Sequence, residues 1–127
     1  MPGDAPLSIN LEKNNLPNQM ESAGYVTAII GKWHLGLGRK VKPVNFNKPV
    51  EFGMQAVGFD YSFIFPATNA RVPTIYLEND ITVGLDKNDP IEVSYKKKIW
   101  DEPTGKEKTE LLKLNHFQGH DGTLSME

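Results

Sequence analysis

The stretch from Gly24 to Gly36 constrains the fold of this 127-residue chain more than any other part. It contains a nearly continuous run of β-branched residues, typical of a strand covered on both faces: Val26, Thr27, Ile29 and Ile30. Gly31 ends this run, because glycine lets the backbone bend. Lys32 and His34 therefore follow the C-terminal end of the strand, where ligands bind in open α/β sheets.

Lys32 and His34 together have the chemistry of an anion site. A lysine offers a compact positive charge, and a histidine can transfer a proton near neutral pH. One interpretation is therefore a site for an anionic ester. The alternative is a solvated lysine beside a hydrogen-bonded loop histidine, because a single Lys-x-His pattern is a weak indication.

The composition limits the class of protein. The length suffices for one modest domain, and 39% hydrophobic residues with a net charge of -2 are ordinary values for a soluble chain. No basic stripe with interleaved aromatic residues indicates nucleic acid binding, and no apolar stretch approaches the roughly 20 residues of a membrane span. We expect no signal peptide in residues 1–4. The lack of cysteine excludes disulfides, thiolate metal sites and cysteine nucleophiles.

A helix is predicted over residues 15–23, directly before the central strand. Asn15 suits the N-cap, Pro17 suits the first turn, and Gly24 is the expected stop. The spacing predicts one apolar face, made of Leu16, Met20 and Ala23. A helix followed at once by a buried strand indicates an α/β fold.

Further strands are predicted after residue 60. Residues 61–65 fit a strand beside the first, so the polar residues after both strands would share one sheet edge. Residues 74–83 fit a hairpin whose Asn79-Asp80 pair suits positive φ angles. Residues 91–95 alternate and fit an edge strand. The predicted fold class is α/β, with a few strands of a mixed sheet, one clear helix and a β-hairpin.

Residues 37–52 are predicted to form a basic loop. Glycine, proline and asparagine leave no room for long elements, and Arg39, Lys40 and Lys42 supply positive charge. The plain interpretation is a solvated loop. The functional alternative is a loop that borders the anion pocket and steers substrate toward it.

Three other stretches give weaker indications. Residues 96–98 are lysines near Trp100 and fit a solvated edge better than a polyanion site. Residues 86–89 lack the glycine and terminal glutamate of a calcium loop. His116 and His120 have a zinc-like spacing, but nearby glycines argue against a helix there. We predict no metal site in these stretches.

The stretch Gly24–Gly36 resembles the second signature of the sulfatase family, the arylsulfatase-type branch of the alkaline phosphatase superfamily. That signature has a Gly-Tyr start, a small and β-branched run, and then Gly-Lys-Trp-His-Leu-Gly, and all its fixed positions are met here. The similarity continues through Gly58–Tyr61 and Pro66–Asn69 to Tyr76–Asp80. The resemblance implies that residues 1–127 are a single partial sulfatase domain, the central segment after the nucleophile motif.

The resemblance also implies roles for four residues. Lys32 would hold a sulfate oxygen and stabilise the activated nucleophile, and His34 would hydrogen-bond the formylglycine and help its proton leave. Thr68 would be a lesser sulfate contact and Asn69 a further substrate-side group. The alternative for Thr68 is a turn residue bonded to the backbone.

The resemblance implies the hydrolysis of sulfate esters by a formylglycine nucleophile and a divalent cation, usually calcium. Formylglycine is made from the first residue of a Cys/Ser-x-Pro-x-Arg motif, and no serine of this chain begins one. The aspartate and asparagine pairs that hold the metal in relatives are not identified here either. We therefore expect these 127 residues alone to bind no calcium and to hydrolyse no chromogenic aryl sulfate.

Two other interpretations stay open: a phosphatase or phosphodiesterase of the same superfamily, and a non-catalytic anion-binding or self-associating module. The implied partner is a sulfate ester, either an aryl sulfate or a sulfated sugar, and neither nucleic acid nor a membrane. Full-length relatives are usually periplasmic, secreted or lysosomal, which does not locate this chain. With one convincing helix to cover the central strand, we also expect an exposed sheet surface that favours self-association.

Overall fold

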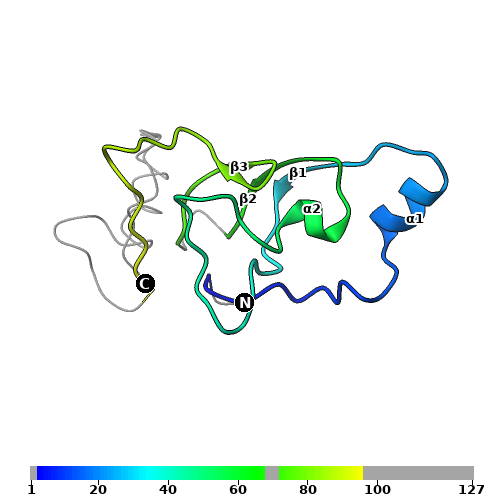
Figure 1. The fold of residues 1–127 in the computed structure, drawn as a ribbon, viewed down its shortest axis with the longest axis horizontal. Helices are drawn as coiled ribbons and strands as arrows, with labels where there is room; N and C mark the ends of the chain where they lie inside the picture. The colour runs from blue at the N-terminus through cyan, green and yellow to red at the C-terminus, as the bar shows by residue number, and fades with distance from the viewer. Residues whose placement is uncertain (1–2, 68–71, 96–127) are drawn as a thin grey trace, which may run out of the picture.

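The computed structural model describes residues 3–67 and 72–95 (Figure 1). These residues contain six elements in the order α1 (Leu16–Ser22), β1 (Ala28–Lys32), α2 (Met54–Val57), β2 (Tyr61–Phe65), β3 (Leu77–Glu78) and β4 (Ile81–Thr82). The strands form one sheet in the order β1-β2-β3-β4, parallel between β1 and β2 and antiparallel in the other pairs. The predicted α/β class, with a mixed sheet and a hairpin, is confirmed.

Helix α1 begins and ends as its sequence predicts. The side-chain oxygen of Asn15 accepts a hydrogen bond from the Asn18 N–H at 3.0 Å, and Pro17 occupies the first turn. Gly24 follows the helix with a φ of 87°. The side-chain nitrogen of Asn15 donates a hydrogen bond to the Val57 carbonyl at 2.8 Å. The cap of α1 therefore also ties this helix to α2.

The predicted apolar face of α1 does not face the core. Leu16 is 66% exposed and Met20 41% exposed, whereas Pro17 is buried. The reason is the hydrogen bond from the Asn15 side chain to α2. It orients the helix so that its N-terminal end, and not its apolar stripe, faces the rest of the chain.

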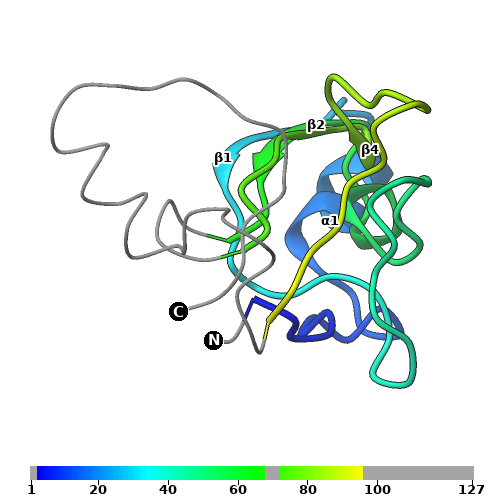
Figure 2. The same ribbon diagram turned by 90° about the vertical axis from the view of Figure 1, so that its left-hand side faces the viewer.

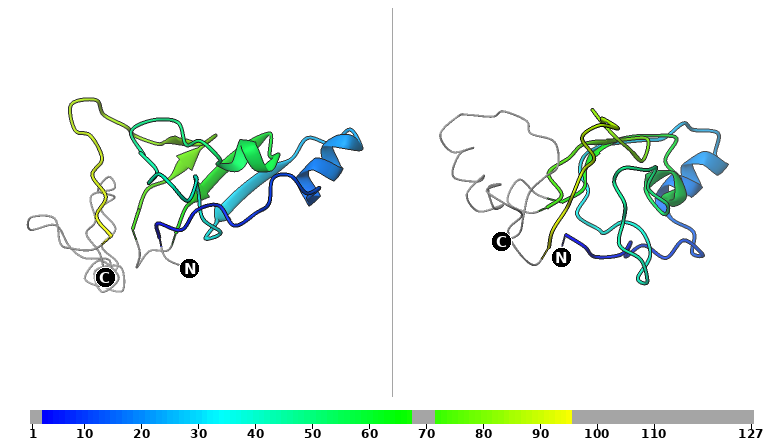
Figure 3. Two further views of the ribbon diagram at one scale, coloured as in Figure 1. Left: turned by 60° about the horizontal axis from the view of Figure 1, so that its bottom comes forward. Right: turned by 60° about the vertical axis from the view of Figure 1, so that its left-hand side comes forward.

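Strands β1 and β2 end together. The register runs from Ala28 opposite Tyr61 to Lys32 opposite Phe65, and Figure 3 shows the two strands side by side. The predicted strand at residues 61–65 and the shared sheet edge are confirmed. The hairpin is confirmed as well, because Asn79 and Asp80 form the turn between β3 and β4 with φ angles of 48° and 64°.

The sheet has one covered and one open face among the described residues. Ser62, Ile64 and Leu77 are buried on the covered face, with α1 and the loop after β1 on that side (Figure 2). Ile30 is 74% exposed and Val26 is 86% exposed. The β-branched pattern of β1 suits cover on both faces, but within the described residues only one face is covered, because every described helix lies on the same side of the sheet.

Two segments differ from the sequence prediction in another way. Residues 91–95 belong to none of the four strands, although their alternation predicts an edge strand. Helix α2 was not predicted, because its N-cap residue Gly53 provides no side-chain cap.

No described helix has the length and apolar character needed to cross a membrane.

The missing cap of α2 comes from the hairpin turn. The carboxylate of Asp80 accepts hydrogen bonds from Met54 N at 2.7 Å and Gln55 N at 2.9 Å. The backbone oxygen of Asp80 also accepts from Val50 N at 2.8 Å, and the residue is only 4% exposed. A charged acceptor on two amide donors, one of them buried, is a strong interaction. Asp80 therefore joins the hairpin to α2 and to the loop before it.

The substitution Asp80→Asn should lower the free energy of unfolding by about 1–3 kcal/mol, because an amide group cannot accept both hydrogen bonds as a carboxylate does. Asparagine tolerates the positive φ of this turn, so the backbone is not the cause. Urea denaturation followed by circular dichroism measures the change. The control is Asp89→Asn at an exposed carboxylate, for which less than about 0.5 kcal/mol is expected. Equal losses in the two variants would contradict the capping role.

Candidate functional site

The candidate site lies at the C-terminal ends of β1 and β2. Lys32 is the last residue of β1 and is exposed. Since side chains alternate along a strand, Lys32 shares the open face of the sheet with Ile30. The next residue, Trp33, points to the core and is only 8% exposed. The main chain continues the pairing, because Trp33 N donates to the Phe65 carbonyl at 3.0 Å.

His34 is held in a tight turn just beyond the sheet. Its backbone N–H donates to the Pro66 carbonyl at 3.0 Å, and its φ of 57° takes the chain out of the strand. The indole N–H of Trp33 donates to the Gly36 carbonyl at 2.7 Å and closes the turn. A Cβ at Gly36 would collide with the carbonyl of Pro6, so no larger residue fits there. The imidazole is half-buried, with its Nδ1 atom inside the protein.

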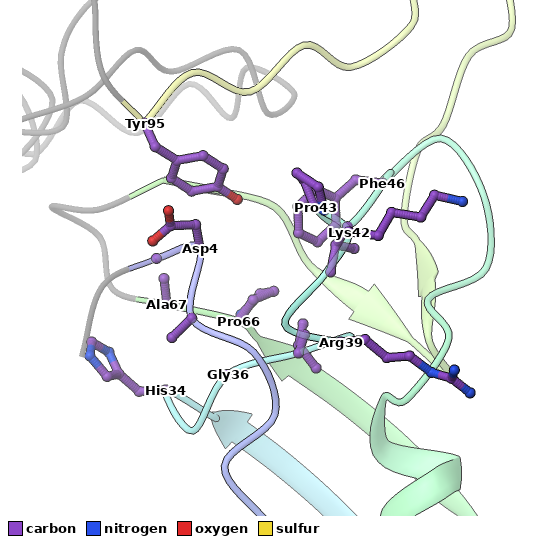
Figure 4. A pocket seen from close by; sticks show the side chains of 14 residues that line it. Asp4, His34, Gly36, Arg39, Lys42, Pro43, Phe46, Pro66, Ala67 and Tyr95 are labelled. Atoms are coloured by element: carbon purple, nitrogen blue, oxygen red, sulfur yellow. The ribbon is translucent and has the colours of Figure 1, made fainter.

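A hollow opens beside His34. Its wall comes from the N-terminal residues 3–5, the chain after β1, residues 66–67 after β2, and Tyr95 (Figure 4). Lys32 is not among the described residues that line it. The structure thus brings Lys32 and His34 to the same sheet edge, as predicted, but only His34 reaches this hollow.

Tyr95 and Asp4 face each other on the far wall of the hollow (Figure 4). Burial, and to a lesser extent the negative charge of Asp4, raise the pKa of Tyr95 to about 12. The phenol is therefore a neutral hydrogen-bond donor across the physiological range. Sequence reasoning missed Tyr95 as a site residue, because only the fold brings this distant segment next to the N-terminal one.

The other predicted site residues lie outside the described residues. This applies to both substrate contacts, Thr68 and Asn69. It also applies to the weaker candidates Trp100, His116 and His120, and to the lysines at 96–98. Their roles stay predictions.

The described residues do not fit a calcium ion. Nowhere in residues 3–67 and 72–95 do three or more histidine, cysteine, aspartate or glutamate side chains stand together as metal ligands. Calcium takes about six to eight oxygen ligands, several of them carboxylates.

Comparisons with known proteins show which family this chain resembles. The family model described as Sulfatase matches residues 7–119. The chain is similar to N-acetylgalactosamine-6-O-sulfatase of Bacteroides thetaiotaomicron, with 46% identity over 123 residues, which cover 97% of this chain and 24% of the relative. The chain thus spans about a quarter of the length of the curated relative it matches.

A solved structure has a similar fold over most of this chain. It is described as "Metabolism of multiple glycosaminoglycans by Bacteroides thetaiotaomicron is orchestrated by a versatile core genetic locus". Its TM-score is 0.74 at 46% identity, and the match covers 87% of this chain and 23% of that chain. The family implies calcium and formylglycine for its full-length members, and the prediction of these two cofactors stays a prediction. The family match and the shared fold together show that this chain belongs to the sulfatase family.

Proposed function

We propose that these residues form part of a sulfatase domain that hydrolyses the sulfate ester of a sulfated sugar, with 6-O-sulfated N-acetylgalactosamine as the favoured substrate. One observation carries the proposal: Lys32 and His34 lie at the joint C-terminal end of β1 and β2. The substrate class is supported by the 46% identity to a relative named for that sulfated sugar. A phosphate ester has less support, because the matching family model is that of sulfatases.

Lys32 is proposed to bind a sulfate oxygen. Negative charge builds up on the sulfate and leaving-group oxygens as the sulfur–oxygen bond breaks, so a cation aimed at them lowers the barrier. The position suits this role, because Lys32 ends its strand and its side chain is exposed. A lysine there presents a point charge without a fixed direction.

His34 is proposed to hydrogen-bond and transfer a proton at the reacting group. The turn from Trp33 to Gly36 fixes its backbone, so the imidazole is positioned before substrate arrives. Thr68 and Asn69 remain proposed substrate contacts. The family implies formylglycine and calcium for full-length members. The formylglycine would be formed from a residue other than those described, and other residues would hold the calcium.

A chimera tests this proposal. Residues 7–119 replace the matching segment of the Bacteroides thetaiotaomicron relative, whose remaining length supplies the rest of the domain. We expect the chimera to release sulfate from 6-O-sulfated N-acetylgalactosamine. Lys32→Ala should lower kcat/KM about 100-fold or more, and His34→Ala about 100- to 10,000-fold, as for other stabilising and proton-transferring groups.

The matched control in the chimera is Lys13→Ala, which removes an exposed lysine from the segment before α1. Its kcat/KM should stay within about twofold of the parent chimera. Circular dichroism confirms that each variant is folded. Full activity of a folded Lys32→Ala chimera would refute the proposed role. A folded chimera without any activity would favour the non-catalytic binding module instead.

The isolated chain is proposed to self-associate through the open face of its sheet. That face carries Ile30, which is 74% exposed, and the stacked pair Phe63 and Tyr76, whose ring centroids lie 5.5 Å apart. Apolar patches of this kind drive association. Sedimentation velocity over a dilution series should show dimers or larger species, and Ile30→Lys should shift them toward the monomer. The control Val41→Lys changes a loop residue that is even more exposed, at 89%, and should have no effect. A monomer at all concentrations would contradict this prediction.

A further inference from the structure

Residues 38–52 form a closed and anchored loop, called here the basic loop. The N–H of Gly38 donates to the Phe52 carbonyl at 3.3 Å, so the two ends of the loop meet. Phe46, near its middle, is only 4% exposed, and its carbonyl accepts from the Thr82 hydroxyl at 2.6 Å. The loop is therefore held on the core by its inner side, and its outer side keeps a defined shape.

The outer side of the basic loop is cationic. The loop carries four cationic side chains and one carboxylate, that of Glu51, in a chain with a net charge of -2. Four charged side chains line one hollow of the loop, and they leave it with a net positive charge: the cations Arg39, Lys42 and Lys48 and the carboxylate of Glu51. None of these three cations forms an ion pair within the part of the chain that the structure describes. Their charge is therefore available to an anionic ligand.

Arg39 is the most firmly placed of the three cations. Its guanidinium carbon lies 4.0 Å from the centroid of the Phe52 ring, which holds the group by a cation–π interaction. Stacking leaves the edge N–H groups in the plane of the guanidinium unused. These donors match two oxygens of a sulfate in a bidentate contact.

The basic-loop hollow adjoins the hollow beside His34. The two share a wall made of Arg39, Lys42, Pro43 and Val44. In Figure 4 the charged ends of Arg39 and Lys42 extend to the same side, away from His34 and Asp4. The charged ends of Arg39 and Lys42 therefore point away from the His34 hollow, on the side of the basic-loop hollow.

From this arrangement we infer that the basic-loop hollow is a second, non-catalytic sulfate subsite. It binds a neighbouring sulfate group of a sulfated polysaccharide while the ester to be cleaved lies at the sheet edge with Lys32 and His34. The identity of the ligand as a sulfated glycan rests on the proposed function. A polymer with several sulfates can place one of them in this hollow while another lies at the sheet edge, whereas a monosaccharide with one sulfate can occupy only one of the two positions.

Direct binding of chondroitin 6-sulfate to the 127-residue chain tests the subsite without any turnover. The double variant Lys42→Ala/Lys48→Ala removes two charges from the hollow. The matched control Lys13→Ala/Lys87→Ala removes two exposed lysines that line neither hollow, so the net charge is the same. Calorimetry should show an affinity loss of about 5- to 25-fold for the first variant and less than about twofold for the control.

Two further arms identify the recognised group. Desulfated chondroitin of equal length should bind at least about fivefold more weakly than chondroitin 6-sulfate, since it lacks one contact of this strength. Sodium sulfate should compete better than sodium chloride at the same ionic strength. Equal affinity losses in the two double variants, or unchanged binding after desulfation, would overturn the inference. Circular dichroism establishes that both variants are folded.

The chimera separates this inference from the proposed function. In an active chimera, the Lys42→Ala/Lys48→Ala change should raise KM for the polymer several-fold more than KM for the sulfated monosaccharide. An inactive chimera would refute the proposed function, whereas the binding comparison would still decide on the subsite. Equal KM changes for the two substrates would contradict the subsite.

Discussion

The parallel pairing of β1 with β2 is the interaction on which the rest of the structure depends. It brings Lys32 opposite Phe65, so both strands stop at one edge of the sheet. The hydrogen bond from the His34 N–H to the Pro66 carbonyl extends the pairing by one step past the strands. Because the candidate residues follow directly from this end, a shift in register would move them away from the segment after β2.

A second constraint is the buried carboxylate of Asp80. It connects the hairpin to α2, and its backbone oxygen connects the same turn to Val50 in the basic loop. One turn residue thus orders two segments that have few regular elements of their own. The cationic side chains of the loop stand on a backbone that is fixed from the inside, which reduces the entropy lost when a ligand binds.

The sheet divides the site chemistry between its two faces. Lys32 lies on the open face with Ile30, while His34 turns beside the hollow near the core. The open face is apolar at Ile30 and charged at Lys32, which lies at its edge. A sulfate that contacts both residues would have to sit at the end of β1, where the two faces meet.

What the sequence determined by itself is local. The Asn15 cap, the Asn79-Asp80 turn and the strand at 61–65 were predictable because each depends on neighbouring residues. The Gly-Lys-Trp-His-Leu-Gly string indicated the family because its residues are contiguous in the chain.

Only the tertiary structure decided which faces are buried and which segments meet. Leu16 has the spacing of a core residue but is exposed, because a hydrogen bond from Asn15 to a distant helix orients α1. Helix α2 escaped prediction since its cap, Asp80, follows 26 residues after Met54. The positive charge of residues 38–52 was evident in the sequence, whereas the closure of the loop and the wall shared by its hollow were not. Propensities and caps act over a few residues, but burial depends on what distant segments bring to the same place.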